Sequence, residues 1–135
     1  MFNVLNNMID WEDLSVLDLF AGTGAFSLEC FSRGAQAILA VDIQPLHVKF
    51  INDNFRNFEA NEAHALKQDV FKFLKDPEET FDLIFADPPF DLPRLEMLPE
   101  LILDSTAAHD ETIVVIEHGK RTDLSGNRGF IQMKS

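Results

Sequence analysis

The chain has 135 residues, of which 46% are hydrophobic and 25% charged, a composition typical of one soluble globular domain spanning residues 1–135. Its apolar runs are far too short to cross a membrane, and no basic segment followed by an apolar one opens the chain, so we expect a cytoplasmic protein. The net charge of −12 argues against nucleic acid binding if taken alone, although Lys120, Arg121, Arg128 and Lys134 make the last segment basic.

Cysteine and histidine usage gives no sign of a disulfide framework or a metal centre. Cys30 is the only cysteine, which excludes an internal disulfide, and it lies in a segment expected to form a packed helix. The histidines are scattered, without the spacing that gathers ligands around a metal ion. We therefore predict no metal site.

The chain opens with a predicted helix and a buried strand. Apolar residues at helical spacing predict an amphipathic helix over residues 1–9, and a branched apolar run interrupted only by Asp18 predicts a central parallel strand over residues 14–19. Gly22 and Gly24 then allow a tight turn that a ligand can approach closely. The helix expected over residues 25–33 points its free N–H groups at this turn. The turn should therefore bind something with an anionic or acceptor-rich end.

The residues around the turn narrow the choice of ligand. A dinucleotide-binding loop needs a third glycine where this chain has Ser27. A carboxylate at Asp18 would repel phosphates but suits an ammonium group. S-adenosylmethionine has an ammonium, a carboxylate and no phosphate, so the pattern favours it over NAD. A strand-to-helix turn without a ligand is the alternative.

A second strand, predicted over residues 37–41, ends at Asp42. The sequence separation between Asp18 and Asp42 is close to the spacing of a ribose-binding acid in a βαβ unit. The two carboxylate oxygens can accept hydrogen bonds from both ribose hydroxyls, or the side chain can cap the helix that opens at Pro45. That helix is predicted to bury a stripe of apolar side chains as core residues: Leu46, Phe50, Ile51, Phe55 and Phe58.

A third strand is predicted over residues 63–67, followed by Asp69 and a short helix. In a nucleoside-binding α/β fold, an acid here can accept from an adenine amino group while the Val70 backbone N–H donates to the ring. The alternative for Asp69 is a simple helix N-cap.

The predicted fourth strand, residues 81–86, leads into Asp87-Pro88-Pro89-Phe90. The two prolines restrict the backbone to extended conformations and remove its N–H donors, so we expect a stiff segment whose carbonyls are free acceptors. The Asp87 carboxylate and the Pro88 carbonyl can together accept from both hydrogens of an exocyclic NH2, which frees the nitrogen lone pair for attack on the methyl group of a sulfonium. Phe90 offers a flat face for stacking an extruded base. A proline-rich turn with a buried phenylalanine is the alternative.

The remaining elements complete an α/β fold. Helical turns are expected over residues 95–104, started or kinked by Pro99, and a fifth and last strand over residues 112–117. The predicted fold is a doubly wound, mostly parallel α/β sheet with strand order 3-2-1-4-5, and its site lies along the carboxyl ends of strands 1 to 4.

Two motifs carry a specific resemblance. IFADPPF, residues 84–90, resembles the signature of S-adenosylmethionine-dependent amino-group methyltransferases, and VLDLFAGTGAF, residues 16–26, resembles their cofactor motif. With residues 2–35 as a whole, the chain is similar to the RsmD family of bacterial 16S rRNA guanine-N2 methyltransferases. The resemblance implies that the catalytic loop is Asp87, Pro88, Pro89 and Phe90, and that the cofactor-binding positions are Asp18, Phe20, Ala21, Gly22, Thr23, Gly24, Asp42, Ile43, Asp69 and Val70.

The resemblance also implies S-adenosylmethionine as cofactor and 16S rRNA, either free or within a small-subunit assembly particle, as partner. The family has a basic N-terminal segment and closing strands that this chain lacks, so we expect a truncated member whose own methylation is weak. The rival functions are methylation of DNA adenine or of a protein glutamine, an NAD-type domain, and a nucleotide-binding remnant without catalysis.

Overall fold

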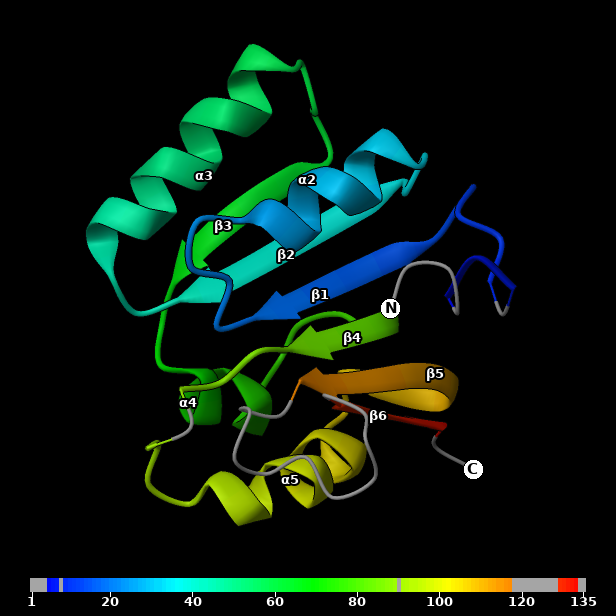
Figure 1. The fold of residues 1–135 in the computed structure, drawn as a ribbon, viewed down its shortest axis with the longest axis vertical. Coiled ribbons are helices and arrows are strands. Elements are labelled where there is room, and N and C mark those ends of the chain that lie inside the picture. Colours follow the sequence, from blue (N-terminus) through cyan, green and yellow to red (C-terminus); the bar gives the residue numbers. More distant parts are fainter. Residues whose placement is uncertain (1–4, 8, 90, 118–128, 134–135) are drawn as a thin grey trace.

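A twisted sheet of six strands forms the centre of the molecule (Figure 1). The computed structural model describes residues 5–7, 9–89, 91–117 and 129–133. The strands follow the order β3-β2-β1-β4-β5-β6, and all neighbours pair in parallel except β5 and β6, which are antiparallel. Their bounds are β1 Ser15–Leu19, β2 Ala37–Asp42, β3 Ala63–Lys67, β4 Phe81–Ala86, β5 Ala108–Glu117 and β6 Gly129–Met133.

Helices cover both faces of the sheet, as the crossovers of a parallel sheet require. One face packs against α2 (Ala25–Ser32) and α3 (Pro45–Asn57), and the other against α4 (Val70–Lys75) and α5 (Leu98–Asp104). A single turn of 3-10 helix, η1 (Leu95–Met97), precedes α5, in which Pro99 occupies the first turn. None of the described helices is both long and apolar enough to cross a membrane.

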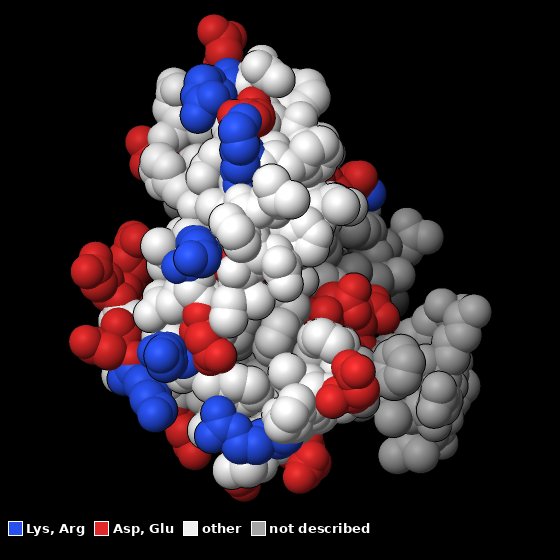
Figure 2. Space-filling view, turned by 90° about the vertical axis from the view of Figure 1, so that its left-hand side faces the viewer, with Lys and Arg blue, Asp and Glu red and all other residues white. Residues whose placement is uncertain are grey.

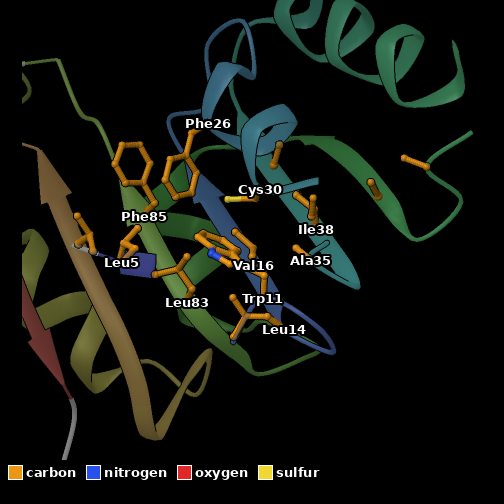
Figure 3. Close-up of a cluster of buried hydrophobic side chains, with 14 of the residues drawn as sticks. Leu5, Trp11, Leu14, Val16, Phe26, Cys30, Ala35, Ile38, Leu83 and Phe85 are labelled. Atoms are coloured by element: carbon orange, nitrogen blue, oxygen red, sulfur yellow. The ribbon is translucent and has the colours of Figure 1, made fainter. Parts of the chain in front are cut away.

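Alternating side chains of the central strands build the two halves of the core. Val16 of β1 joins Phe26 and Cys30 on the α2 side, where Figure 3 shows them together with Phe85. Leu17 of β1 faces the α4 and α5 side. Because successive side chains of a strand point to opposite faces, a central strand covered on both sides must be apolar at nearly every position. Among the buried residues of β1, Asp18 is the exception, and it lies at 1% exposure; Ser15, at the start of the strand, is only partly buried.

A polar network stabilises the end of the sheet at which β1, β4 and β5 begin. Asp82 of β4 accepts hydrogen bonds at Oδ2 from the Ser15 backbone N–H (3.0 Å) and hydroxyl (3.1 Å), and its Oδ1 lies 2.7 Å from His109 Nε2. Burial acts to raise the pKa of Asp82, but the hydrogen bonds from Ser15 and His109 hold it below the ordinary value. The network ties β1, β4 and β5 together at the edge away from the carboxyl ends of the strands.

Three expectations about the fold are corrected by the structure. Leu46, Phe50 and Phe58 are 80%, 51% and 58% exposed, so the buried stripe of α3 is made by Ile51 and Phe55 without them. The fifth strand begins at Ala108 rather than residue 112. A sixth, antiparallel strand follows it at the edge of the sheet. Of the helix expected over residues 1–9, residues 5–7 are helical and most of the rest lies outside the described residues.

Candidate active site

A cleft of about 980 Å³ opens at the carboxyl ends of the parallel strands, where α/β sheets place their ligands. Most of the residues singled out from the sequence line it: Asp18, Phe20, Ala21, Gly22, Thr23, Asp42, Ile43, Asp69, Val70, Asp87, Pro88 and Pro89. Gly24 lies behind the lining, and Phe90 lies outside the described residues. Residues from the ends of β1, β2, β3 and β4 therefore meet in one place.

The turn between β1 and α2 depends on left-handed backbone at several positions. Gly22 and Gly24 have φ values of 59° and 81°, and Phe20 has a φ of 58°. A Cβ added at Gly24 would stand 2.8 Å from Cγ1 of Ile51 in α3, whereas one added at Gly22 would have no atom within 4 Å. Gly24 is thus required for close packing of α3, and Gly22 leaves open space on the cleft side.

Asp42 holds the glycine turn in place. Its Oδ2 accepts a hydrogen bond from the Gly22 backbone N–H (2.8 Å), and its Oδ1 accepts one from the Gln44 backbone N–H (2.8 Å). Nδ1 of His47 lies 3.2 Å from the same Oδ1. The N-cap of α3 is Gln44, so Asp42 does not cap that helix in the usual way; it joins the end of β2 to the turn after β1. Oδ2 keeps a further lone pair for a ligand, and Oδ1 keeps one when Nδ1 of His47 carries no proton.

Asp18 is buried beneath the turn. Its carboxylate accepts a hydrogen bond from the Ser27 hydroxyl at 2.6 Å, which connects β1 to the first turn of α2. Burial raises the pKa of Asp18 to about 7, although the bonds from Ser27 oppose the rise, and the charges of Asp87 and Asp42 add to it. An ammonium group in the cleft would favour the ionised form of this carboxyl.

Asp69 is the N-cap of α4. Its Oδ1 accepts from the backbone N–H groups of Phe71 (2.8 Å) and Lys72 (3.2 Å), so the simple capping alternative is correct. Its Oδ2 and the Val70 N–H form no recorded hydrogen bond with the described residues, and both residues line the cleft. The cap therefore leaves one acceptor beside one donor, the pair that an adenine edge needs. Ile43, across the cleft, is 56% exposed.

The segment after β4 carries a carboxylate at the mouth of the cleft. The Asp87 backbone N–H donates to the Leu19 carbonyl at 3.4 Å, which fixes this residue beside the end of β1. Although Asp87 is exposed as a residue, partial burial of its carboxyl raises its pKa. The expectation that the proline carbonyls are all free is wrong for Pro89, whose carbonyl accepts from the Leu92 N–H at 3.0 Å. In the described residues no such donor is recorded for the Pro88 carbonyl.

Several cleft residues were not singled out from the sequence. Phe26 of α2 and Phe85 of β4 stack with ring centroids 3.9 Å apart and an angle of 9°, and both line the cleft (Figure 3). Glu29, Gln44 and His47 also line it. Helical spacing from the glycine turn would have found Glu29, which follows Ala25 by one turn. The contact between Phe26 and Phe85 depends on how α2 packs over β4, which the sequence pattern does not specify.

The donor set fits a nucleoside with an amino-acid group better than a metal ion. In the part of the chain that the structure describes, no three His, Cys, Asp or Glu side chains cluster in a way that could hold a metal. The acids at Asp18, Asp42 and Asp69 lie at the ends of successive strands along the cleft, which suits a ligand with an ammonium, ribose hydroxyls and an adenine amino group in a row.

Comparison with solved structures defines the class. The chain superposes on the structure titled "Putative methyltransferase yhhF from Escherichia coli" with a TM-score of 0.86, covering 99% of this chain and 84% of that one at 23% identity, which shows a shared fold. The fold is that of the S-adenosylmethionine-dependent methyltransferases. The family model described as Conserved hypothetical protein 95 matches residues 1–135, and the chain belongs to this family, the RsmD family.

Two relatives of known sequence add detail. "Ribosomal RNA small subunit methyltransferase D" of Escherichia coli (strain K12) is 29% identical over 117 residues, which cover 87% of this chain and 58% of the relative. "Putative protein N5-glutamine methyltransferase MJ0928" of Methanocaldococcus jannaschii is 33% identical over 93 residues, 69% of this chain and 45% of the relative. The chain thus spans about half the length of these relatives.

Proposed function

We propose that the protein is an S-adenosylmethionine-dependent N-methyltransferase that modifies the 2-amino group of a guanine in 16S rRNA. The observation that carries this proposal is the meeting, in one cleft, of the Asp42-bonded glycine turn and the Asp87-Pro88-Pro89 segment. Membership of the RsmD family and the printed name of the Escherichia coli relative support the rRNA substrate.

The cofactor would lie along the ends of β1, β2 and β3. Asp18 faces its ammonium group, Asp42 accepts from the ribose hydroxyls, and Asp69 with the Val70 N–H meets the adenine edge. Ile43 offers exposed apolar surface beside the ribose and adenine positions. When bound, S-adenosylmethionine supplies an electrophilic methyl group on a sulfonium.

The Asp87 segment would act on the amino group that receives the methyl. The Asp87 carboxylate and the Pro88 carbonyl accept hydrogen bonds from its two hydrogens, which draws the nitrogen lone pair out of the ring system. Two prolines keep these acceptors in a fixed position, so the rate gain comes from orientation. Phe90, outside the described residues, is proposed to stack on the extruded base.

Transfer of a labelled methyl group tests the proposal. The protein is incubated with labelled S-adenosylmethionine and one candidate substrate at a time: 16S rRNA, small-subunit particles, DNA or protein. We expect label in guanine N2 of the rRNA, loss of transfer in Asp87→Ala, and unchanged cofactor affinity in that variant. Asp91→Ala, an exposed acid nearby in sequence, is the matched control. Full transfer by Asp87→Ala would refute the role given to Asp87.

A second candidate is methylation of a protein glutamine or of DNA adenine. The relative from Methanocaldococcus jannaschii, named for N5-glutamine methylation, favours the first of these. The same pair of acceptors suits any planar NH2 group, so the cleft chemistry does not separate them. Label that enters protein or DNA and not rRNA would establish this candidate. An absence of transfer to every substrate, with cofactor binding retained, would indicate a nucleotide-binding remnant.

A further inference from the structure

Lysine and arginine side chains of the described residues fall into two groups. Those at the C-terminal end of α2 and on α3 are paired within the molecule: Arg33 with Glu29 at 2.9 Å, and Lys49 and Arg56 with Asp53 at 2.7 and 3.0 Å. The other described cations are exposed and have no recorded carboxylate partner among the described residues: Lys67, Lys72, Lys75 and Arg94. Among the described residues, ion pairs therefore neutralise the cations near α2 and α3, and leave the other cations without a carboxylate partner.

Three of the four unpaired cations, Lys72, Lys75 and Arg94, lie on the side of the sheet that α4 and α5 cover. Lys67 ends β3, Lys72 and Lys75 belong to α4, and Arg94 lies on the connection that begins with Asp87. Figure 2, which looks onto the face where the strands end, shows Lys and Arg side chains in its upper and lower parts, with uncharged residues between them and Asp and Glu side chains among and beside them. On a chain of net charge −12, this is where the described surface can attract an anion.

Arg94 is held by an aromatic ring that borders the cleft. Its guanidinium carbon lies 4.4 Å from the centre of the Phe71 ring, a cation–π contact that leaves the N–H edge of the planar group available. Phe71 lines the main cleft and also a neighbouring hollow of about 260 Å³, which Lys75, Arg94 and Asp104 line as well. The cation is therefore positioned next to the cleft that contains Asp87, without being part of its floor.

We propose that Arg94, Lys72 and Lys75 form a phosphate-binding strip for the RNA backbone that flanks the target nucleotide. An arginine fixed by stacking can donate two parallel hydrogen bonds to a phosphate, and lysines add point charges along the strand. A base that enters the cleft from a polynucleotide would bring its neighbouring phosphates past Phe71, the ring on which Arg94 stacks and which belongs to the same helix as Lys72 and Lys75. A neutral glutamine side chain would bring no such charge, so the strip favours RNA over the protein candidate. Asp104 lies in the same hollow and weakens the positive potential locally.

The inference rests on the proposed function, and its test separates the two. Binding of a fluorescein-labelled single-stranded oligoribonucleotide is measured at several KCl concentrations between about 50 and 200 mM for the unmodified chain and the Arg94→Gln, Lys72→Gln, Lys75→Gln triple variant. Each phosphate that the variant no longer neutralises should reduce the slope of log affinity against log salt by about 0.7, so the slope of the triple variant should be smaller by about 2. Calorimetry with S-adenosylhomocysteine checks that the cofactor cleft of the variant is intact.

The matched control removes paired cations from the other side of the sheet. The Lys49→Gln, Arg56→Gln double variant should keep the salt slope of the unmodified chain, because these side chains are bonded to Asp53. An unchanged slope in the triple variant, an equal reduction in the control, or no RNA binding by a chain that binds S-adenosylhomocysteine would each overturn the strip. Methyl transfer to rRNA together with an unchanged slope would leave the proposed function standing and remove the inference alone.

Discussion

The buried carboxyl of Asp18 gives a quantitative prediction of how the stability of the chain depends on pH. Burial raises its pKa from 3.8 to about 7. The folded chain therefore holds a proton that the unfolded chain releases between about pH 4 and pH 7. The stability contributed by protonated Asp18 is present in full below about pH 4 and is lost as the pH rises through 7. The difference between the two pKa values corresponds to about 4 kcal/mol.

Urea unfolding of the unmodified chain and of Asp18→Asn at several pH values between about 4 and 8 measures this cost. The asparagine is neutral throughout and keeps an oxygen that can accept from the Ser27 hydroxyl. We expect the free energy of unfolding of the variant to rise relative to the unmodified chain by up to about 4 kcal/mol between pH 4 and pH 8, since groups that do not interact with Asp18 cancel in the difference.

An exposed acid provides the control for this experiment. Asp53 lies on α3, and the hydrogen bond from Lys49 lowers its pKa below the ordinary value. Its favourable contribution is present above the ordinary pKa and is lost only as the pH falls below it, so Asp53→Asn should show no relative gain over the same pH range. A difference between Asp18→Asn and the unmodified chain that stays constant from pH 4 to pH 8 would refute the burial argument.

Three further predictions concern the glycine turn and the cleft. Gly24→Ala should lower the free energy of unfolding by about 2 to 5 kcal/mol in urea titrations, because left-handed backbone and a contact of 2.8 Å with Ile51 both oppose a Cβ. Gly34→Ala, which meets no atom within 4 Å, should lose only about 1 to 2 kcal/mol, and equal losses would contradict the crowding. Asp42→Asn should lower the free energy of unfolding by about 1 to 3 kcal/mol in the same assay, because an amide NH2 replaces one of the two acceptor oxygens and loses the bond from either Gly22 or Gln44. An unchanged midpoint would argue against these bonds. Binding of S-adenosylhomocysteine near pH 7 should release a proton from Asp18, which calorimetry in buffers of different ionisation enthalpy measures, and Asp18→Asn should abolish the release.

Much of the fold follows from local pattern. The strands at residues 63–67 and 81–86 were predicted with the bounds that the structure shows; the second is an apolar run typical of a buried parallel strand, whereas the first is a mostly exposed edge strand. The helix expected over residues 25–33 is α2, and Gly34, with a φ of 102°, follows its C-cap. The strand order 3-2-1-4-5 is confirmed, and β6 extends it.

Tertiary packing determines which apolar side chains of α3 are buried and where β6 pairs, and the local sequence pattern specifies neither. On α3 the apolar residues occupy two adjacent ridges, and only the one with Ile51 and Phe55 contacts the sheet, which leaves Leu46 and Phe50 exposed. The antiparallel strand β6 is stabilised by pairing with β5, a long-range contact with no local signal.

The sequence predicted most of the residues that the structure brings together in the cleft, but not the hydrogen bonds between them. In the sequence Ser27 is notable only as a missing glycine, while the structure gives it a bond to the Asp18 carboxylate. Asp42 was predicted as a ligand group, and the same side chain also holds the Gly22 N–H. Such bonds join residues on different elements, so they depend on how the strands align and cannot be seen in any single segment.

Cofactor binding by the cleft is the property on which the proposed function depends most directly. Isothermal calorimetry with S-adenosylhomocysteine should show one site per chain. Asp42→Ala, which removes both the bond to the glycine turn and the proposed ribose acceptors, should weaken that site by about tenfold or more. Asp53→Ala, on the exposed side of α3, should bind as the unmodified chain does. A folded chain that shows no binding of S-adenosylhomocysteine would contradict the proposed function.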